Sequence, residues 1–534
     1  MSIYLKSNSE YNISLLYSLN FFIGGIPVMP NIERWGMYEV SAKGRLEGNP
    51  FVDYYIKGVF TGKNETVEVD GFYDGDGTYK VRFMPSFEGA YTYKVSGNFS
   101  NEIFEGEFIV IAPSHNNHGP VRIANTYHFA YEDGTPYYSV GTTCYVWTHQ
   151  PFEQQEKTLE TLRNGYFNKI RFCVFPKHYD FNITDPITFP YEGTPCDCSG
   201  ITSENFSEYT GSNHENIWDF KRFNPEHFRL IEKRIQDLMD IGVEADLIIM
   251  HPYDRWGFSQ MSAENDDLYW KYVIARFAAY RNVWWSLANE YDLMNKSISD
   301  WERYASIICE KDPYNRLRSI HSCIYFYDHT RPWITHCSIQ RQDIYKCAEL
   351  SHEYRERFKK PVVLDEICYE GNISHGWGNI SGQELVRRFW EASLRGAYAG
   401  HGETYVHPEN ILWWSHGGEL HGTSPGRIKF LHKILSETPK HGLRLSNRFS
   451  WDEVVAELDS FTKDNDYLIF YYGFHRPTQR HYHFDNERVY HVEIIDTWDM
   501  TIKEVGTFRG KFTVNLPGKE YMAVRVRTKK AITL

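Results

Sequence analysis

Short apolar segments alternate with amphipathic helical segments from about residue 120 to residue 432, and this alternation limits the folds open to the chain. Such a pattern is typical of a parallel sheet whose strands are joined by crossover helices. In chain order, the apolar segments are YYSVGTTCYVW, FNKIRFCVF, VEADLIIMHPY, NVWWSLANEYD, RLRSIHSC, WITHCSIQ, PVVLDEICYEG and GAYAGHGETYVH. Eight parallel strands close into a barrel. The sequence therefore predicts an α/β fold with a (β/α)8 TIM barrel over residues 120–432.

Two regions that flank the barrel segment alternate with the period of β-strands. Residues 29–115 contain runs such as EGEFIVIAP between turn residues, and we predict an immunoglobulin-like β-sandwich there. Residues 440–534 include DYLIFYYGF, VYHVEIIDTW and EYMAVRVRT and predict a C-terminal β-sandwich. Residues 1–28 are an extension of uncertain order, too polar to span a membrane and without the basic start of a signal peptide. We hypothesise that Met29 is the natural start.

Charge and cysteine content narrow the possible partners. The net charge of -13 is spread along the chain without a basic run, so we expect no nucleic acid and no membrane as partner. Nine scattered cysteines, an odd number, are typical of free thiols in a reducing compartment, and we predict a cytoplasmic protein. Cys196 and Cys198 with His214 fit the spacing of zinc ligands poorly, so we predict no metal and no cofactor. Self-association as a homo-oligomer stays open.

Two glutamates follow strands that lie far apart in the sequence. Glu290 ends the fourth predicted strand and Glu366 ends the seventh. Catalytic groups of TIM barrels sit at the carboxyl ends of the strands, where these two positions face each other across the barrel. Retaining glycosidases need two carboxyl groups about 5 Å apart, one to protonate the leaving oxygen and one to attack the anomeric carbon. The pair therefore predicts a retaining glycoside hydrolase.

The motifs around these glutamates resemble those of a known group of enzymes. WWSLANEYDL is similar to the fourth-strand signature of clan A glycoside hydrolases, and VVLDEICYEG is similar to the E-x-x-Y-E-G motif of apiosidase-like, cellulase-related barrels. The resemblance covers nearly the whole chain, including both flanking β domains. It implies that Glu290 is the acid/base and Glu366 the nucleophile, that Asn289 binds the sugar 2-hydroxyl, and that Arg171 binds the nucleophile. Apiosidases have Asp as the acid where this chain has Glu290, so the resemblance does not fix a β-apioside as substrate.

Further residues are candidates for contacts with the sugar. His251, in HPYDRWGF, is expected to bind it, and His336, Tyr369 and Glu403 complete the predicted polar set. Aromatic residues make up 16% of the chain, and sugar rings stack on aromatic faces. Trp147, Trp256 and Trp414 are candidates for such stacking, although core packing explains each of them about as well. Glu370 is a further carboxylate at the barrel end.

The expected mechanism leaves two alternatives open. Glu290 is expected to start protonated while Arg171 keeps Glu366 ionised, so that one acts as acid and the other as nucleophile. An inverting enzyme would need carboxyl groups roughly 6.5 to 9.5 Å apart, and a sugar-binding protein without catalysis would need neither role. The long aromatic segment 178–222 is expected to wall the cleft into a pocket, which predicts exo action on plant-type oligosaccharides or glycosides. The sequence does not identify the sugar or the linkage.

Overall fold

The computed structural model describes residues 29–211, 215–406, 412–439, 442–448, 452–460 and 467–528, and the backbone of two short strands, β1 (Phe22–Ile23) and β2 (Ile26–Pro27). The rest of the predicted extension over residues 1–28 lies outside the described part of the chain. By its contacts the chain divides into two compact units, residues 1–114 and residues 115–534. Each unit is described below by itself.

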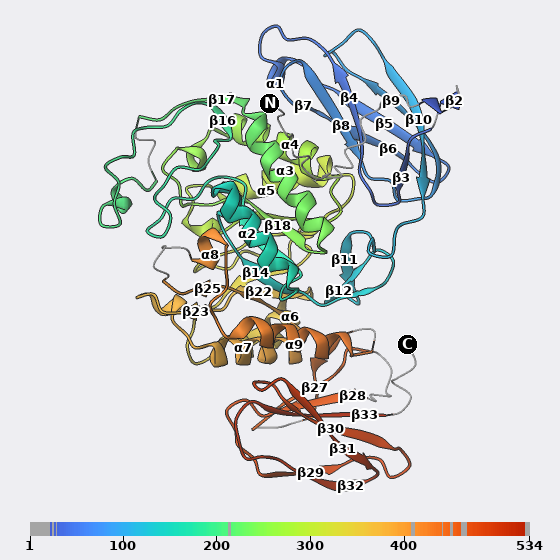
Figure 1. Cartoon of the computed structure of the whole chain (residues 1–534), viewed down its shortest axis with the longest axis vertical. Helices are drawn as coiled ribbons and strands as arrows, with labels where there is room; N and C mark the ends of the chain where they lie inside the picture. The colour runs from blue at the N-terminus through green and yellow to red at the C-terminus, as the bar shows by residue number, and fades with distance from the viewer. Residues whose placement is uncertain are drawn as a thin grey trace, which may run out of the picture. The chain divides into compact units, whose positions relative to one another are not determined.

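The first unit is built from two packed sheets (Figure 1). One sheet has the order β3-β10-β9-β5-β6 and the other the order β4-β8-β7. The rings of Phe60 and Phe83, one from each sheet, stack at 4.4 Å and are fully buried. The all-β character expected here is confirmed, and the immunoglobulin-like topology stays a prediction. The elements are β3 (Asn31–Glu33), β4 (Tyr38–Lys43), α1 (Pro50–Asp53), β5 (Lys57–Gly62), β6 (Thr66–Asp70), β7 (Phe72–Tyr73), β8 (Thr78–Phe83), β9 (Gly89–Ser96) and β10 (Phe104–Ile111).

The second unit contains the predicted barrel. Its eight-stranded sheet is parallel throughout, with the order β20-β19-β18-β15-β14-β24-β22-β21. Pairing of β14 with β24 joins the first barrel strand to the eighth. Between β20 and β21 the backbone N–H of Thr335 donates to the carbonyl of Arg318 at 2.9 Å. The TIM-barrel prediction is therefore confirmed. The barrel strands are β14 (Val140–Thr143), β15 (Lys169–Cys173), β18 (Glu244–Met250), β19 (Val283–Ala288), β20 (Arg318–Ser319), β21 (Cys337–Gln340), β22 (Val362–Glu366) and β24 (Tyr398–His401).

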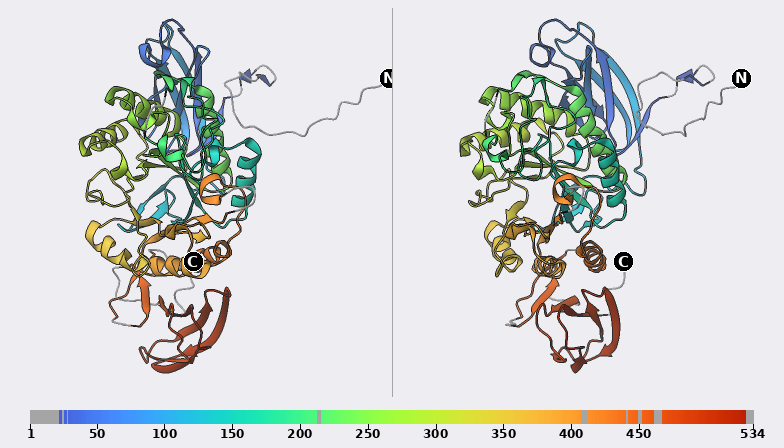
Figure 2. Two further views of the ribbon diagram at one scale, coloured as in Figure 1. Left: turned by 90° about the vertical axis from the view of Figure 1, so that its left-hand side faces the viewer. Right: turned by 60° about the vertical axis from the view of Figure 1, so that its left-hand side comes forward.

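Helices surround the barrel strands (Figure 2). The helix expected before the third strand is α3, which begins after the Asn224 cap and ends before Gly242, a residue with φ of 73°. Glycine favours that left-handed conformation because it has no Cβ. None of the helices in the described ranges is long and apolar enough to cross a membrane. The helices are α2 (Phe152–Arg163), α3 (Pro225–Asp240), α4 (Ala263–Phe277), α5 (Ile298–Lys311), α6 (Ser351–Phe358), α7 (Gly382–Leu394), α8 (Trp413–His416) and α9 (Ser424–Ser436).

Short additional strands decorate the two ends of the barrel. At the amino-terminal end, Phe129 of β12 packs against Trp284 and Tyr398, which lie at the starts of β19 and β24. At the other end, β16 pairs with β17, and β23 pairs with β25. These strands are β11 (Val121–Ala124), β12 (His128–Tyr131), β13 (Pro136–Tyr137), β16 (Tyr191–Thr194), β17 (Ile217–Phe223), β23 (Glu370–Gly371) and β25 (Glu403–Thr404).

A buried ionic cluster occupies the barrel interior. The ammonium of Lys169, 1% exposed, donates to Asp246 Oδ2 at 2.7 Å and to Asp365 Oδ1 at 3.0 Å. Ser338 donates to the other oxygen of Asp365 at 2.5 Å. Asp365 directly precedes Glu366 in β22, where the pairing with β21 is irregular, and the two side chains contact Lys169 and Arg171, which lie two residues apart on β15. Lys169 therefore supports the strand that carries Glu366.

The C-terminal part of the second unit is also all-β. A six-stranded sheet of order β26-β27-β28-β33-β30-β31 is joined by the pair β29-β32 around a core that includes Phe470, Val492 and Phe512. Helices α7 and α9 lie between the barrel and this sheet (Figures 1 and 2), where Trp390 of α7 stacks on Tyr471 at 5.5 Å. The strands are β26 (Leu443–Leu445), β27 (Val454–Leu458), β28 (Tyr467–Tyr471), β29 (Gln479–His483), β30 (Tyr490–Asp496), β31 (Thr501–Phe508), β32 (Lys511–Asn515) and β33 (Met522–Thr528).

Candidate active site

Glu290 and Glu366 both lie at the carboxyl end of the barrel. Glu290 comes two residues after the last residue of β19, in a left-handed conformation with φ of 51°. Glu366 is the last residue of β22. Both side chains are 5% exposed. The structure therefore brings two buried carboxyl groups to the end of the barrel where catalytic groups are found.

Hydrogen bonds connect the two glutamates through Asn289. The Asn289 amide oxygen accepts from Arg171 Nη1 at 2.8 Å and from the Tyr145 hydroxyl at 3.2 Å. The Tyr145 hydroxyl also donates a short hydrogen bond to Glu366, and Arg171 Nη1 lies 3.5 Å from the same carboxylate oxygen. The Asn289 amide nitrogen donates to Glu290 Oε2 at 3.3 Å. Because its oxygen faces two donors, the orientation of the Asn289 amide is fixed.

Two further side chains support Glu290. The Tyr253 hydroxyl donates a short hydrogen bond to Glu290 Oε2. The backbone N–H of Glu290 donates to His321 Nδ1 at 3.3 Å, so the proton of a neutral His321 ring lies on Nε2. Nε2 is 3.7 Å from Glu366 Oε1. Burial lowers the pKa of His321 well below its usual value, so the ring is neutral near pH 7.

The electrostatics of the pair differ from the sequence-based expectation. Burial and the negative charge of Glu290 raise the pKa of Glu366 to about 7. Arg171 lowers this pKa, but its effect is smaller than that of burial. This direction is opposite to the one expected from Arg171 alone.

An aromatic cluster forms one wall of the site. Trp414 contacts Tyr145, Tyr179 and Tyr369 at ring-centroid distances of 5.3, 5.4 and 6.0 Å. Trp377, from the loop after β22, lies 4.8 Å from Trp414. Of the sugar-stacking candidates, Trp414 therefore lies with the glutamates, because Tyr145 binds Glu366 directly. Tyr369 belongs to the same cluster.

None of the hydrogen bonds described around the glutamates involves Trp147, Trp256 or His251. Trp147 and Trp256 are fully buried, the first against Phe172 and the second with its ring nitrogen donating to Asp185 at 3.1 Å. His251 follows β18 and binds the Phe175 carbonyl at 3.2 Å through Nε2. Burial lowers the pKa of His251 to about 3, so it is neutral. Sugar contacts by these three side chains stay a prediction.

His336 lies at the other end of the barrel. It precedes β21, and its ring contacts Phe129 at 5.7 Å and Trp284 at 5.2 Å. These contacts are the packing that closes the amino-terminal end of the barrel. The structure therefore does not bring His336 together with the glutamates, because the residue lies just before its strand, whereas Glu290 and Glu366 follow or end theirs.

Glu403 and Glu370 bind the backbone of the loop that leads into α9. Glu403 accepts from the backbone N–H groups of His421 and Gly422 at 2.5 and 2.8 Å. Glu370 accepts from the N–H groups of Thr423 and Ser424 at 2.7 and 2.9 Å, which are orphan donors at the start of α9. Burial raises the pKa of Glu403 to about 7. Both carboxyl groups are therefore committed to backbone donors.

Four functional candidates were not singled out from the sequence: Tyr145, Tyr253, His321 and Lys177. Each follows a barrel strand within a few residues, so the rule that selected the glutamates would also have selected them. The Lys177 ammonium lies 3.4 Å from the ring centroid of Tyr145 and 4.2 Å from that of Tyr253. Besides their positions after strands, their side-chain types indicate a site, because tyrosine, histidine and lysine can each donate a hydrogen bond to a carboxylate or a sugar.

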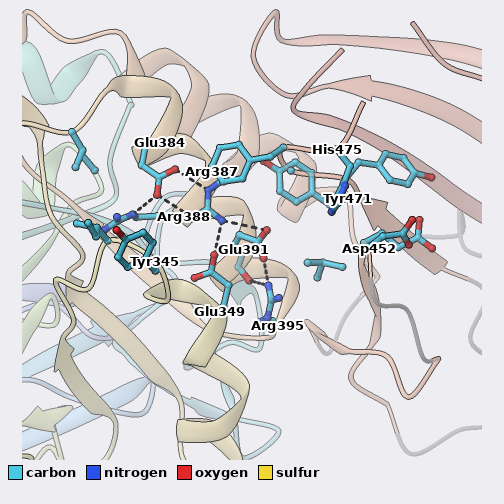
Figure 3. A pocket seen from close by; sticks show the side chains of 17 residues that line it. Tyr345, Glu349, Glu384, Arg387, Arg388, Glu391, Arg395, Asp452, Tyr471 and His475 are labelled. Carbon is cyan, nitrogen blue, oxygen red and sulfur yellow. Dashed lines mark hydrogen bonds and ion pairs between the residues drawn. The ribbon is translucent and has the colours of Figure 1, made fainter. Parts of the chain in front are cut away.

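A separate cavity of about 570 Å³ lies beside α7, where this helix faces the C-terminal sheet (Figure 3). Arg387 and Arg388 line it, and both bind the carboxylate of Glu384. Arg387 also contacts Glu349 at 2.6 Å. Because these cations already have carboxylate partners, we place the active site at the barrel end and not in this cavity.

The described residues include no group of three or more His, Cys, Asp or Glu side chains that could hold a metal ion. Cys198 donates to Asp185 at 3.2 Å, and both Cys196 and Cys198 are free thiols. His214, considered above as a third ligand, lies outside the described residues.

Comparisons with known proteins identify similar families and structures. Residues 124–456 match a family described as "Apiosidase-like, catalytic domain", and residues 31–98 and 451–527 match two domains of unknown function, DUF5060 and DUF5605. A Bacteroides vulgatus crystal structure, described as a candidate glycoside hydrolase, is 36% identical, with 94% of this chain and 100% of that chain covered and a TM-score of 0.85. A glycoside hydrolase family 5 protein of the same species is 14% identical, with 77% and 94% covered and a TM-score of 0.56, a likeness of fold alone. No curated protein matches the chain.

Proposed function

Because the chain belongs to the family with an apiosidase-like catalytic domain and is a glycoside hydrolase, we propose that it cleaves β-glycosidic bonds by a retaining, double-displacement mechanism. The observation that carries this proposal is the pair of buried glutamates, Glu290 and Glu366, linked by hydrogen bonds through Asn289. Two carboxyl groups linked in this way suit an acid and a nucleophile that act on the same bond.

In the first step, a carboxylate oxygen of Glu366 attacks the anomeric carbon. The bond to the leaving oxygen breaks, and that oxygen takes a proton from Glu290, the proposed acid. Tyr145 and Arg171 support ionised Glu366 by donating to it, which favours the proton on Glu290 when substrate is bound. The products are a free alcohol and a glycosyl ester of Glu366.

In the second step, ionised Glu290 removes a proton from water while the water oxygen bonds to the anomeric carbon. The ester bond to Glu366 breaks and its carboxylate is restored, while Glu290 is protonated again. Two displacements on the same carbon return the original anomeric configuration. Tyr253 binds Glu290 in the free site and supports the ionised form that this step requires.

We further propose that the enzyme is exo-acting on plant-type oligosaccharides or glycosides. The support lies in the loops after β15 and β22, which are tied together beside the aromatic cluster. Asp180 and His375, one from each loop, form a hydrogen bond at 3.4 Å. Phe181 contacts Trp377 and Trp414 at 6.2 and 6.0 Å. Loops joined on one side favour a pocket over an open groove, and a pocket admits the end of a chain.

The roles of the two glutamates can be tested with activated aryl β-glycosides, chosen from a panel by their cleavage by the wild type. Glu366→Gln removes the nucleophile, so turnover should fall by several orders of magnitude, and azide should not restore it. Glu290→Ala removes proton transfer only, so the activated substrate should still form the glycosyl-enzyme and then stall. Azide attacks without a general base and should restore turnover, with a β-glycosyl azide as product.

A matched control for these variants is Glu244→Gln. Glu244 is also a buried barrel glutamate, and burial raises its pKa to about 7, but it lies at the start of β18 and binds the Trp284 ring nitrogen. This variant should retain its activity. An α-anomer as the first-formed product of the wild type on an aryl β-glycoside would show an inverting enzyme, and the absence of azide rescue in Glu290→Ala would refute the assigned roles.

A further inference from the structure

Two lysines near β15 are equally buried but have different partners. Lys169 and Lys177 are 1% and 2% exposed. The ammonium of Lys169 binds two carboxylates. Within the described ranges, by contrast, no carboxylate, carbonyl or hydroxyl group accepts a hydrogen bond from Lys177 Nζ, and its contacts are with aromatic rings.

The rings around Lys177 belong to the active site. Its ammonium lies 3.4 Å from the ring centroid of Tyr145, 4.2 Å from that of Tyr253, 4.6 Å from that of Tyr179 and 5.5 Å from that of Trp414. Tyr145 and Tyr253 are the two residues whose hydroxyl groups donate to the catalytic carboxylates. Lys177 is therefore separated from each carboxylate by a single tyrosine side chain.

Aromatic faces attract the charge of Lys177 but leave its hydrogen-bonding capacity unused. An ammonium has three N–H donors and no acceptor. A buried polar group without a hydrogen-bond partner is unfavourable, and cation–π contacts compensate for only part of this. A ligand oxygen placed beside the glutamates would accept a hydrogen bond and remove the deficit.

We propose that Lys177 is a substrate-binding residue whose ammonium donates a hydrogen bond to an oxygen of the sugar held between Glu290 and Glu366. The inference rests on the proposed function, because it places the sugar at this pair. The oxygen belongs either to a hydroxyl group of a neutral sugar or to the carboxylate of an acidic sugar, and in both cases it is an acceptor for a charged donor. Lys177 then determines which sugars the site accepts.

The test couples changes in the enzyme to changes in the substrate. Lys177→Met keeps the length of the side chain and removes the charge and all three donors. For the wild-type substrate, kcat/KM should fall by about 10- to 100-fold, the usual effect of a hydrogen bond to a charged group. The same measurement is made with aryl β-glycosides that each lack one hydroxyl group, and with an aryl β-uronide beside its neutral counterpart.

One of these substrate changes should cost the wild type about 10- to 100-fold in kcat/KM and cost Lys177→Met little more. Coupling to a hydroxyl group identifies a neutral sugar as the source of the oxygen, and coupling to the carboxylate identifies an acidic one. Lys177→Gln keeps a donor and should recover part of the activity. Lys360→Met, which removes a lysine that binds the carbonyls of His329 and Arg331 outside the site, is the control.

Equal losses of Lys177→Met on every substrate, or no loss, would overturn the inference. So would the loss of a cooperative melting transition in both Lys177 variants, because that is the result expected of a purely structural ammonium. These outcomes are separate from the proposed function. A failed azide test counts against the roles of Glu290 and Glu366, whereas missing coupling in an active wild type counts against Lys177 alone.

Discussion

Replacing Lys169 with Met should destabilise the barrel and make its stability depend on pH. In the native protein the Lys169 ammonium lies 2.7 Å from Asp246 and 3.0 Å from Asp365, and all three side chains are buried. Lys169 lowers the pKa of Asp365 below its usual value, and the pKa of Lys169 itself is raised. The methionine would fill the space but leave two buried carboxylates without their shared cation.

The magnitude follows from the charges that remain. Removing one partner of a buried ion pair costs about 3 to 5 kcal/mol of unfolding free energy. In the variant, repulsion between Asp246 and Asp365 raises their pKa values, so one of them takes up a proton on folding. The folded state then binds more protons than the unfolded state, and stability increases as the pH falls. The variant should regain about 1.4 kcal/mol relative to the wild type for each pH unit between 7 and 5.

Urea denaturation of the full chain at pH 7 and pH 5, followed by circular dichroism, would measure both effects. The double variant Lys169→Met/Asp246→Asn removes one of the competing charges and should recover much of the loss at pH 7. Lys433→Met, which breaks an exposed pair with Glu437, is a control expected to change stability by less than about 1 kcal/mol. A loss below about 1 kcal/mol at pH 7, or equal losses at both pH values, would refute the reasoning.

Two further predictions concern activity. The pKa of Glu366 is raised to about 7, and the first step needs one proton in the site for the leaving oxygen. We therefore expect kcat/KM to fall as the pH rises above about 7. A pH–rate profile that stays level to pH 9 would contradict this. Tyr253→Phe removes the hydroxyl that binds Glu290, so kcat/KM should fall by about 10- to 100-fold with little change in melting temperature. Steady-state kinetics and a thermal melt would measure the two quantities. An unchanged kcat/KM would argue against a supporting role for Tyr253.

The barrel could be predicted from the sequence because its signal is local. Each strand is a short apolar run, and the order of eight such runs between amphipathic helices leaves little choice of topology. The same regularity indicated the ends of β19 and β22, and hence Glu290 and Glu366. His336 shows the limit of this reasoning, since a residue just before its strand lies at the end of the barrel remote from the glutamates.

The hydrogen-bond partners of the site could not be predicted, because they depend on how the loops fold after each strand. Glu403 and Glu370 lie at the correct end of the barrel but bind the backbone at the start of α9. The pKa of Glu366 depends on a balance between burial and Arg171, and the depth of burial is a property of the folded structure. The sequence identifies the charged residues around Glu366, but the size of each one's effect on its pKa depends on the folded structure.

The left-handed backbone of Glu290 has a consequence for protein engineering. An L-amino acid costs about 1 to 2 kcal/mol in this conformation, so the barrel holds its proposed acid/base at a position that achiral glycine would occupy with less strain. A library screened for heat resistance alone would favour glycine at this position, and glycine would remove the proposed acid/base. Directed evolution of a more stable enzyme therefore has to select for catalysis in every round, because at this residue stability favours glycine and catalysis requires glutamate.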